Sequence, residues 1–404
     1  MERNGTSPSR NGLLDALRGV AVAAVVAYHV WPDRVTGGFL GVDVFFVLSG
    51  FLITDALVSQ LASGRAHVLR QFWARRVRRL APALLVVLVT VTALAGIVGG
   101  SPAARLRPQV VGALTFTSNW YQAGSGQSYF DRFDPPVFQH LWSLAVEEQL
   151  YLVWPLLLLA LVRFVPAHRC RVIVVAALVA ASASAMAVLE VPGHDPSRLY
   201  FGTDTHGFSA LVGALAALST GLLPRALEGR HRLRIAGGVL MAMLAALGIL
   251  MGSFALMDDT GALAYRGGIL AADLCTAVLV LGSVELDHVR LSRSAPARVL
   301  RWLGTRSYGV YLWHWPVLVL ADGRWPAGSP AEVAARDGLV VGASLLLCAL
   351  SWRYVEEPVL RGTWRHQLRS SVLVTRGLKR RVVPAVAGAA LACVLSVYAV
   401  STSP

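Results

Sequence analysis

Apolar segments of about 20 residues recur along almost the whole chain, and each is long enough to cross a bilayer core. With 55% hydrophobic and 15% charged residues among 404, the composition is too apolar for a soluble domain of this size. The sequence predicts an all-α, polytopic bundle of about ten or eleven transmembrane helices. The expected spans lie near residues 12–31, 38–61, 80–100, 141–162, 172–190, 204–223, 235–256, 267–284, 303–321, 336–356 and 382–400.

The placement of the basic residues predicts the orientation of the chain. The formal net charge is +14, but arginine and lysine lie in short segments between apolar runs, which argues against nucleic-acid binding. With a cytoplasmic N-terminus most of them fall on the inner side, as the positive-inside rule requires. We therefore expect a multi-pass protein of the cell membrane, in contact with membrane lipids. The first apolar run ends in HVWPD and has no small-residue cleavage site, which indicates a retained span.

The distribution of apolar and basic segments divides the chain into three parts. We expect a membrane core of about ten spans at residues 1–360, a basic cytoplasmic segment at 361–381 and an additional C-terminal span at 382–404. If the last segment does not cross the membrane, a ten-helix core remains with both termini inside. The four cysteines occur singly, without a CxxC pair, and we expect packed thiols and no metal site.

An arginine and a histidine lie inside the first apolar segment. Arg18 and His29 are eleven residues apart, which on a helix places them within about 20° of one face and about 16 Å apart along the axis. Ionisable groups at membrane depth are candidates for function, because they are costly unless they are paired. Each residue alone could be structural, near the inner and outer interfaces respectively. Their common stripe favours a functional role.

Asp43 follows at the outer start of the second apolar segment, and we expect it at about the depth of His29. A carboxylate within reach would orient the imidazole and raise its basicity. Capping of a helix at the interface is an equally good explanation. A few residues further on, Ser49 and Gly50 predict a close helix packing site, because small residues let backbones approach.

Two glutamates enter the membrane with the fourth segment, HLWSLAVEEQLYLVWP. Glu147 and Glu148 are expected in the outer half of the bilayer, near the level of His29. Adjacent residues cannot share one helix face, and at most one glutamate can therefore point at a given site. We expect one to pair structurally and the other to be a candidate for acid/base or positioning work.

Four arginines precede the third segment on the predicted cytoplasmic side: Arg75, Arg76, Arg78 and Arg79. On a helix Arg75 stacks on Arg78 and Arg76 stacks on Arg79, and this spacing suits bidentate binding of phosphates. Positive-inside topology and anionic lipid headgroups would also explain them. The cluster therefore predicts either a lipid-facing basic surface or a site for a phosphorylated cofactor.

Five motifs between residues 11 and 360 resemble, in this order, those of the membrane-bound acyltransferase family three. They are LDALRGVAVAAVVAYHVWP, GGFLGVDVFFVLSGFLIT, FWARRVRRLAP, HLWSLAVEEQLYLVWP and SYGVYLWHWP. Members of this family include O-acetylases of bacterial O-antigen, peptidoglycan and exopolysaccharide, and macrolide-sugar acyltransferases. The resemblance implies a ten-helix core that moves an acyl group from cytoplasmic acyl-CoA, with acetyl-CoA as first candidate, to a hydroxyl of a carbohydrate or glycosylated acceptor. That acceptor would belong to the cell envelope or be a secreted metabolite.

The resemblance also implies roles for individual residues. Arg18 and His29 match the family's essential arginine and histidine, the arginine pairs match its RxxR motif for the CoA donor, and the two glutamates match those of its WSLAVEEQ motif. We assign His29, Asp43, Glu147 and Glu148 to catalysis, and Arg18, Arg75, Arg76, Arg78 and Arg79 to donor binding. His29 would act as general base or accept the acyl group transiently, and both alternatives stay open.

Two departures from the family pattern affect these expectations. Some relatives append an extracytoplasmic domain that completes the transfer, whereas here one further span follows, which places acceptor chemistry in the membrane core or on a separate extracytoplasmic partner. The sixth segment has TDTH where the family has TDTR, leaving His206 at a position where arginine is usual. The outer loop around Trp120 and Tyr121 suits either sugar stacking or a cover over the helix ends.

Two other classes of protein would also bury ionisable groups between helices. A transporter or exporter of a polysaccharide or lipid-linked sugar is the main alternative, although the sequence contains no internal repeat. A non-catalytic membrane scaffold would tolerate replacement of Arg18, His29 and the arginine pairs.

Overall fold

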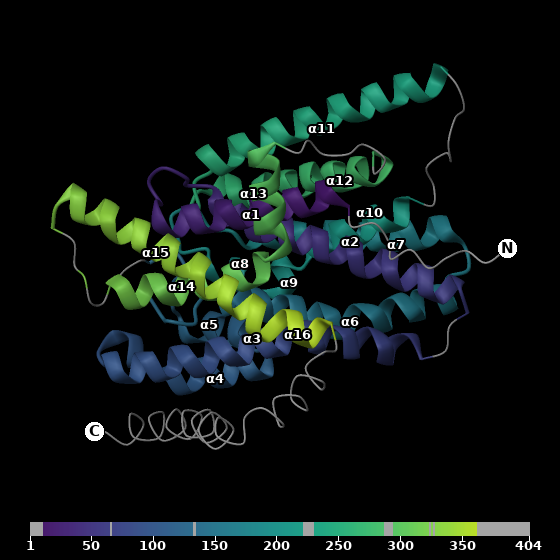
Figure 1. The fold of residues 1–404 in the computed structure, drawn as a ribbon. Coiled ribbons are helices and arrows are strands. Elements are labelled where there is room, and N and C mark those ends of the chain that lie inside the picture. Colours follow the sequence, from purple (N-terminus) through teal and green to yellow (C-terminus); the bar gives the residue numbers. More distant parts are fainter. Residues whose placement is uncertain are drawn as a thin grey trace. The chain divides into compact units, whose positions relative to one another are not determined.

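The computed structural model describes residues 11–64, 67–131, 135–220, 230–286, 294–322, 325 and 328–361. Within these ranges all regular secondary structure is helical (Figure 1). Eight of the described helices are long and apolar enough to cross a membrane. They are Gly12–Val30, Gly38–Ala62, Val68–Val98, Leu141–Phe164, His168–Leu189, Ala236–Leu256, Ala264–Glu285 and Pro330–Leu360. The predicted all-α membrane fold is confirmed.

Three of the eleven expected spans have no counterpart among these eight helices. The sixth corresponds to a 4-residue helix and a 12-residue helix on either side of Gly207, and the ninth to a 16-residue helix. At about 1.5 Å per residue, 16 residues reach roughly 24 Å, less than the bilayer core. The eleventh expected span lies outside the described residues, as does nearly all of the basic segment at 361–381.

The chain divides into two compact units, described here one at a time. Unit 1 comprises residues 1–60, 154–194 and 204–307, and unit 2 comprises residues 61–153, 195–203 and 308–404. The helices that lie wholly or mainly in unit 1 are α1 (Gly12–Val30), η1 (Gly38–Leu40), α2 (Gly41–Ala62), α7 (His168–Leu189), α9 (Thr203–His206), α10 (Phe208–Ser219), α11 (Arg230–Leu256), η3 (Ala264–Gly268), α12 (Ile269–Glu285) and α13 (Ala295–Thr305). The last two residues of α2 and Thr203 of α9 belong to unit 2. The helices of unit 2 are α3 (Val68–Val98), η2 (Ser101–Ala103), α4 (Leu106–Thr115), α5 (Ser118–Ser125), α8 (Ser197–Phe201), α14 (Ser307–Asp322), α15 (Pro330–Ser351), η4 (Trp352–Glu356) and α16 (Glu357–Leu360). Helix α6 (Leu141–Phe164) contributes its residues 141–153 to unit 2 and the rest to unit 1.

Helix α1 is tightly packed against α13 in unit 1. The Asn11 side chain caps α1 by accepting hydrogen bonds from the backbone N–H groups of Leu13 and Leu14. A Cβ atom added at Gly19 would lie 2.1 Å from the carbonyl oxygen of Leu300. The two backbones can approach this closely only because the position has no side chain.

Helices α2 and α10 cross in the same way. A Cβ atom at Gly50 would lie 1.8 Å from the carbonyl oxygen of Ala210, and one at Gly213 would lie 1.9 Å from that of Val47. Each helix therefore supplies a glycine at the point where the other approaches. This confirms the close packing predicted at Gly50 and fixes the position of α2 within unit 1.

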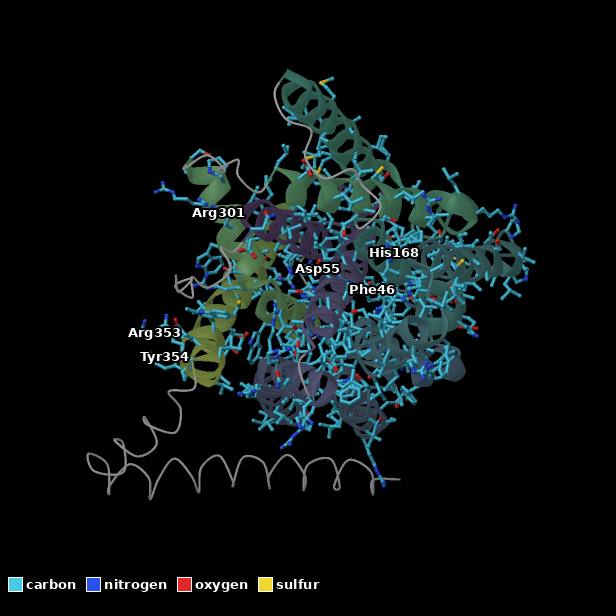
Figure 2. All side chains as sticks on the ribbon, turned by 90° about the vertical axis from the view of Figure 1, so that its right-hand side faces the viewer. Phe46, Asp55, His168, Arg301, Arg353 and Tyr354 are labelled. Carbon is cyan, nitrogen blue, oxygen red and sulfur yellow. The ribbon has the colours of Figure 1, made fainter. Side chains whose placement is uncertain are left out.

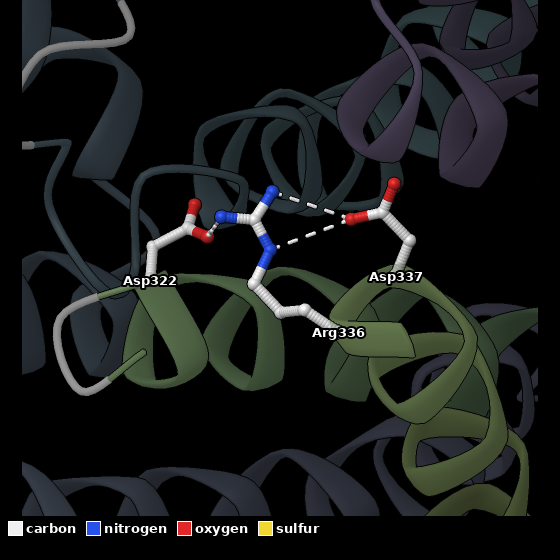
Figure 3. Close-up of polar contacts among 3 residues, drawn as sticks. All are labelled: Asp322, Arg336 and Asp337. Atoms are coloured by element: carbon white, nitrogen blue, oxygen red, sulfur yellow. Dashed lines mark hydrogen bonds and ion pairs between the residues drawn. The ribbon is translucent and has the colours of Figure 1, made fainter. Parts of the chain in front are cut away.

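An arginine joins α14 to α15 in unit 2. The Arg336 guanidinium lies 2.8 Å from Asp322 Oδ1 and 3.3 Å from Asp337 Oδ1 (Figure 3). Helix α15 then continues through the π-helical η4 into α16. On η4 the exposed side chains of Arg353 and Tyr354 point away from the helix (Figure 2).

The α2–α10 crossing generates a stability prediction. Replacement Gly50→Ala forces a methyl group against the Ala210 backbone, and we expect it to destabilise the protein by about 1–3 kcal/mol, as overpacking does. Gly248→Ala is the matched control, because a Cβ there meets nothing within 4 Å. We expect that control to be neutral or to stabilise by up to about 1 kcal/mol. Thermal unfolding of the two purified variants in detergent measures the difference, and equal midpoints would contradict the crossing.

Candidate functional sites in the two units

Helix α1 carries both ionisable residues of the first apolar segment. Because α1 is helical without interruption from Gly12 to Val30, Arg18 and His29 lie on the stripe that their spacing predicts. Both side chains are half-buried. His29 lies in the last turn of α1, where the helix dipole favours a positive charge.

The C-terminal end of α1 is tied to the segment before η3. The ring of Tyr28 packs edge-on against that of His29, with centroids 5.1 Å apart. The Tyr28 hydroxyl donates a 2.5 Å hydrogen bond to the Asp259 carboxylate, and Tyr265 donates one to the backbone oxygen of Asp259. Asp259 thus anchors the turn that carries His29. Sequence reasoning missed this residue, because only the fold brings it to α1.

The start of α2 packs against the middle of α1, whereas the sequence predicted it near the level of His29. Cβ atoms at Gly38 and Gly41 would lie 2.4 Å and 2.5 Å from the carbonyl oxygens of Ala24 and Ala21. The chain therefore turns back beside the middle of α1 before α2 begins. Ala21 is eight residues before His29, about 12 Å along the helix axis. The glycines therefore place the start of α2 well away from His29 along the axis of α1.

Asp43 is engaged by the helix pair α9 and α10. Its Oδ1 atom lies 2.5 Å from His206 Nε2 and accepts a 3.2 Å hydrogen bond from the Ser209 hydroxyl. His206 is fully buried, and its ring meets that of Phe46, which is labelled in Figure 2. The orientation of His29 by Asp43 stays a prediction. The TDTH departure was the sequence signal for His206, but only the fold supplied its partner.

The four arginines of α3 divide into two pairs by exposure. Arg75 and Arg78 are exposed, whereas Arg76 and Arg79, one turn apart, are half-buried. The guanidinium of Arg76 lies 4.4 Å from the ring centroid of Tyr151 on α6. Trp73 strengthens the same contact by donating a hydrogen bond to the Tyr151 carbonyl oxygen. Arg76 therefore packs against α6 within unit 2, and Arg79 is half-buried one turn further along α3.

The two glutamates of α6 lie close to this arginine face. Glu147 and Glu148 are both half-buried, and Glu148 interacts electrostatically with Arg76. One carboxylate oxygen of Glu148 is buried with no hydrogen-bond partner among the described residues. Tyr308 of α14 lies within electrostatic range of both glutamates. Unit 2 thus brings together an acid and an arginine that the sequence assigned to opposite halves of the membrane.

Gln149, the next residue of the same motif, fixes the orientation of this turn. Its amide donates hydrogen bonds to Asn119 Oδ1 and to the carbonyl oxygen of Phe116, and its Oε1 accepts one from the Thr203 hydroxyl at 2.6 Å. Asn119 in turn donates to Thr203 and to the carbonyl oxygen of Phe201. Sequence reasoning missed Gln149, although it directly follows the glutamate pair.

A cluster of hydroxyls and imidazoles lies at the start of α6 and on α14. Tyr311 donates a 2.7 Å hydrogen bond to the His140 carbonyl oxygen, and Ser143 lies 2.6 Å from the Tyr311 hydroxyl. The rings of His140 and His314 meet with centroids 5.9 Å apart. Burial, and then the nearby His314, hold the pKa of His140 well below its usual range. His140 is therefore a neutral imidazole at physiological pH.

The described part of the segment between α3 and α6 forms short helices that are hydrogen-bonded to the residues before α6. Gln109 of α4 accepts a hydrogen bond from the backbone N–H of Phe138, and Gln122 of α5 donates one to the carbonyl oxygen of Gln139. Trp120 is nevertheless 42% exposed, with the Arg198 guanidinium 5.3 Å from its ring centroid. The segment thus presents an aromatic side chain at its surface, and sugar stacking and a cover over the helix ends both stay predictions.

Comparison with known proteins identifies the family. The family described as "Acyltransferase domain" matches residues 11–353. The peptidoglycan O-acetyltransferase OatA of Listeria monocytogenes is 37% identical over 353 residues, which cover 86% of this chain and 55% of that protein. The O-acetyltransferase OatA of Staphylococcus aureus is 32% identical over 348 residues, with 86% and 56% covered.

The chain spans about half the length of these curated relatives. No solved structure matches it. The family match nevertheless includes every motif described above, from the Arg18–His29 stripe to the SYGVYLWHWP segment of α14. This multi-pass membrane protein therefore belongs to the acyltransferase-domain family, as its motifs predicted.

Proposed function

We propose that this protein is a membrane O-acyltransferase that moves an acetyl group from cytoplasmic acetyl-CoA to a hydroxyl of a cell-envelope carbohydrate, with peptidoglycan as the first candidate. The single observation that carries the proposal is the family match over residues 11–353. The names of the two relatives support the acetyl group and the acceptor class. Because the chain spans about half of their length, delivery of the acceptor by a separate extracytoplasmic partner is part of the proposal.

The reaction exchanges one acyl bond for another. The acceptor hydroxyl oxygen attacks the thioester carbon, the carbon–sulfur bond breaks, and the hydroxyl proton ends on the CoA sulfur. A base must take that proton as the oxygen attacks, and a cation must hold the charged donor. An imidazole can supply the base, and a guanidinium can supply the cation.

His29 is our candidate for the base. An imidazole can remove the hydroxyl proton directly, or it can accept the acyl group and pass it on. Asp43, Glu147 or Glu148 would stabilise the imidazolium that forms in either case. Arg18, about 16 Å further along the same helix face, would contact the narrow pantetheine arm of the donor.

The half-buried arginine pair of α3 is our candidate for donor binding. Arg76 and Arg79, the inward pair, are half-buried, whereas Arg75 and Arg78, the outward pair, are exposed. The inward pair can form bidentate hydrogen bonds with the phosphates of CoA, while the outward pair meets lipid headgroups. The Tyr151 ring under Arg76 keeps that guanidinium in a fixed position.

The role of His29 is tested by acetyl transfer. We expect His29→Ala to reduce transfer of radiolabelled acetyl from acetyl-CoA to envelope glycans by at least about 100-fold, the usual contribution of a general base. His194→Ala is the matched control, since that imidazole is exposed. Membranes with equal amounts of each protein are assayed for hydroxylamine-labile label, and retained activity in His29→Ala would refute the role.

The two arginine pairs predict different kinetics. Replacing Arg76 and Arg79 by glutamine should raise the KM for acetyl-CoA about tenfold or more, because a charge-assisted hydrogen bond to phosphate is lost at each position. The double replacement of Arg75 and Arg78 should leave that KM within about threefold, as exposed charges contribute little. Equal effects of the two double variants would contradict the division into an inward and an outward pair.

The exposed Trp120 predicts a role towards the acceptor. If a sugar stacks on this ring, Trp120→Ala should raise the KM for the acceptor roughly fivefold, which corresponds to about 1 kcal/mol. The KM for acetyl-CoA should stay unchanged. Tyr354→Ala removes an exposed aromatic ring elsewhere in unit 2 and serves as the control (Figure 2). Unchanged acceptor kinetics would leave the loop as a structural cover only.

A further inference from the structure

Two hydrogen bonds join α3 to neighbouring helices of unit 2, one on each side of the inward arginine pair. Trp73 Nε1 donates a 2.9 Å hydrogen bond to the carbonyl oxygen of Tyr151 on α6. About two turns further along α3, the carbonyl oxygen of Leu80 accepts a 2.9 Å hydrogen bond from the Tyr308 hydroxyl of α14. The inward pair therefore lies on a stretch of helix that is held at both ends.

A proline makes the acceptor of the first hydrogen bond available. Pro155 lies inside α6 and has no N–H to donate to the carbonyl oxygen of Tyr151, four residues earlier. A backbone carbonyl at membrane depth needs a donor from within the protein, because hydrocarbon supplies none. The Trp73 indole is such a donor, and it can reach this oxygen only where α3 lies against this turn of α6. The bond therefore fixes the position of α3 along α6.

The second hydrogen bond comes from a closely packed part of unit 2. A Cβ atom added at Gly309, the residue after Tyr308, would lie 3.0 Å from Cys348 Sγ and 3.3 Å from Glu356 Oε1. Helix α14 thus lies close to α15 and η4 at the turn that carries Tyr308. Since Leu80 is buried, the hydroxyl holds an interior part of the α3 backbone. The two bonds fasten α3 to two different helices.

The position of Arg76 depends on the first of these bonds. Its guanidinium lies 4.4 Å from the ring centroid of Tyr151 and 5.5 Å from that of Phe72. Aromatic rings contact the face of a guanidinium, whereas its N–H groups point outwards in its plane. Trp73 binds the backbone of the same tyrosine whose ring contacts Arg76. A shift of α3 along α6 would therefore move Arg76 off that ring and redirect its N–H groups.

We propose that Trp73 and Tyr308 are positioning residues for donor binding, because their hydrogen bonds hold α3 with the inward arginine pair already placed for the phosphates of CoA. This inference rests on the proposed function, which assigns the donor to that pair. A site that need not be ordered first binds more tightly, since ordering lowers the affinity. In this assignment neither residue contacts the donor. Loss of either bond should raise the Kd and the KM for the donor and leave kcat nearly unchanged.

Binding of CoA to the purified full-length protein in detergent, measured by titration calorimetry, tests both residues. Trp73→Phe and Tyr308→Phe keep an aromatic ring and remove the donor group, and each should raise the Kd about fivefold, as the net loss of one hydrogen bond does. Tyr311→Phe is the matched control, because it removes another hydroxyl-to-carbonyl bond of α14. It should leave the Kd within about twofold. An unchanged Kd in Trp73→Phe or Tyr308→Phe would overturn the role of that residue, and an equal rise in the control would overturn both.

Coupling to Arg76 separates positioning from a general structural role. In an Arg76→Gln background, Trp73→Phe should raise the Kd for CoA much less than in the wild type, because the group that it positions is gone. In acetyl transfer, Trp73→Phe and Tyr308→Phe should raise the KM for acetyl-CoA and keep kcat within about twofold. The same rise in Kd with and without Arg76, or a fall in kcat at unchanged KM, would contradict positioning.

Thermal unfolding tests the first helix contact without any donor. Pro155→Ala gives the Tyr151 carbonyl a helical partner, and Trp73→Phe should therefore lower the unfolding midpoint less in that background than in the wild type. Equal decreases in both backgrounds would refute the contact. Absence of CoA binding by the wild type would instead refute the proposed donor site and the positioning role that rests on it, while the unfolding measurements would still judge the helix contact.

Discussion

Every polar side chain in the interior of this protein must find its partner within the protein, because the hydrocarbon core of a membrane offers none. Among the described residues, two connected groups of hydrogen bonds meet this requirement, whereas one carboxylate oxygen of Glu148 is buried without a hydrogen-bond partner. In unit 1 Asp43 is held by His206 and Ser209. In unit 2 Gln149, Asn119 and Thr203 form a closed set of hydrogen bonds beside the glutamates of α6. Both groups include residues next to, or part of, the motifs that define the family.

Glycines determine where these partners can meet. Gly38 and Gly41 bring the start of α2 against the middle of α1, and Gly50 and Gly213 bring α2 against α10. Without them the backbones would separate, because the added Cβ atoms would fall within 2.5 Å of a carbonyl oxygen. The pairing of Asp43 with His206 therefore depends on residues that carry no functional group. Small residues at helix contacts are in this sense part of the candidate site.

The family motifs also lie in different chemical surroundings in the two units. In unit 1 the His29 end of α1 is anchored by Asp259, which limits the rotation of the turn that carries the imidazole. In unit 2 Arg76 lies against Tyr151 and near Glu148, which places a cation beside an acid.

The sequence alone indicated that the chain folds in a membrane, that it is helical, which family it belongs to, and most of the candidate residues. These conclusions need only local information, since about 20 apolar residues suffice for a span and the ordered motifs identify the family. Helical periodicity likewise placed Arg18 and His29 on one face and paired the arginines of α3. Only the tertiary structure decided that Asp43 meets His206 and that Glu148 lies near Arg76. It also decided that Arg76 and Arg79 are the half-buried pair, and that Asp259 and Gln149 form hydrogen bonds beside the candidate residues. Such contacts join residues up to 231 positions apart, and they arise from backbone approach and burial, which no local pattern encodes.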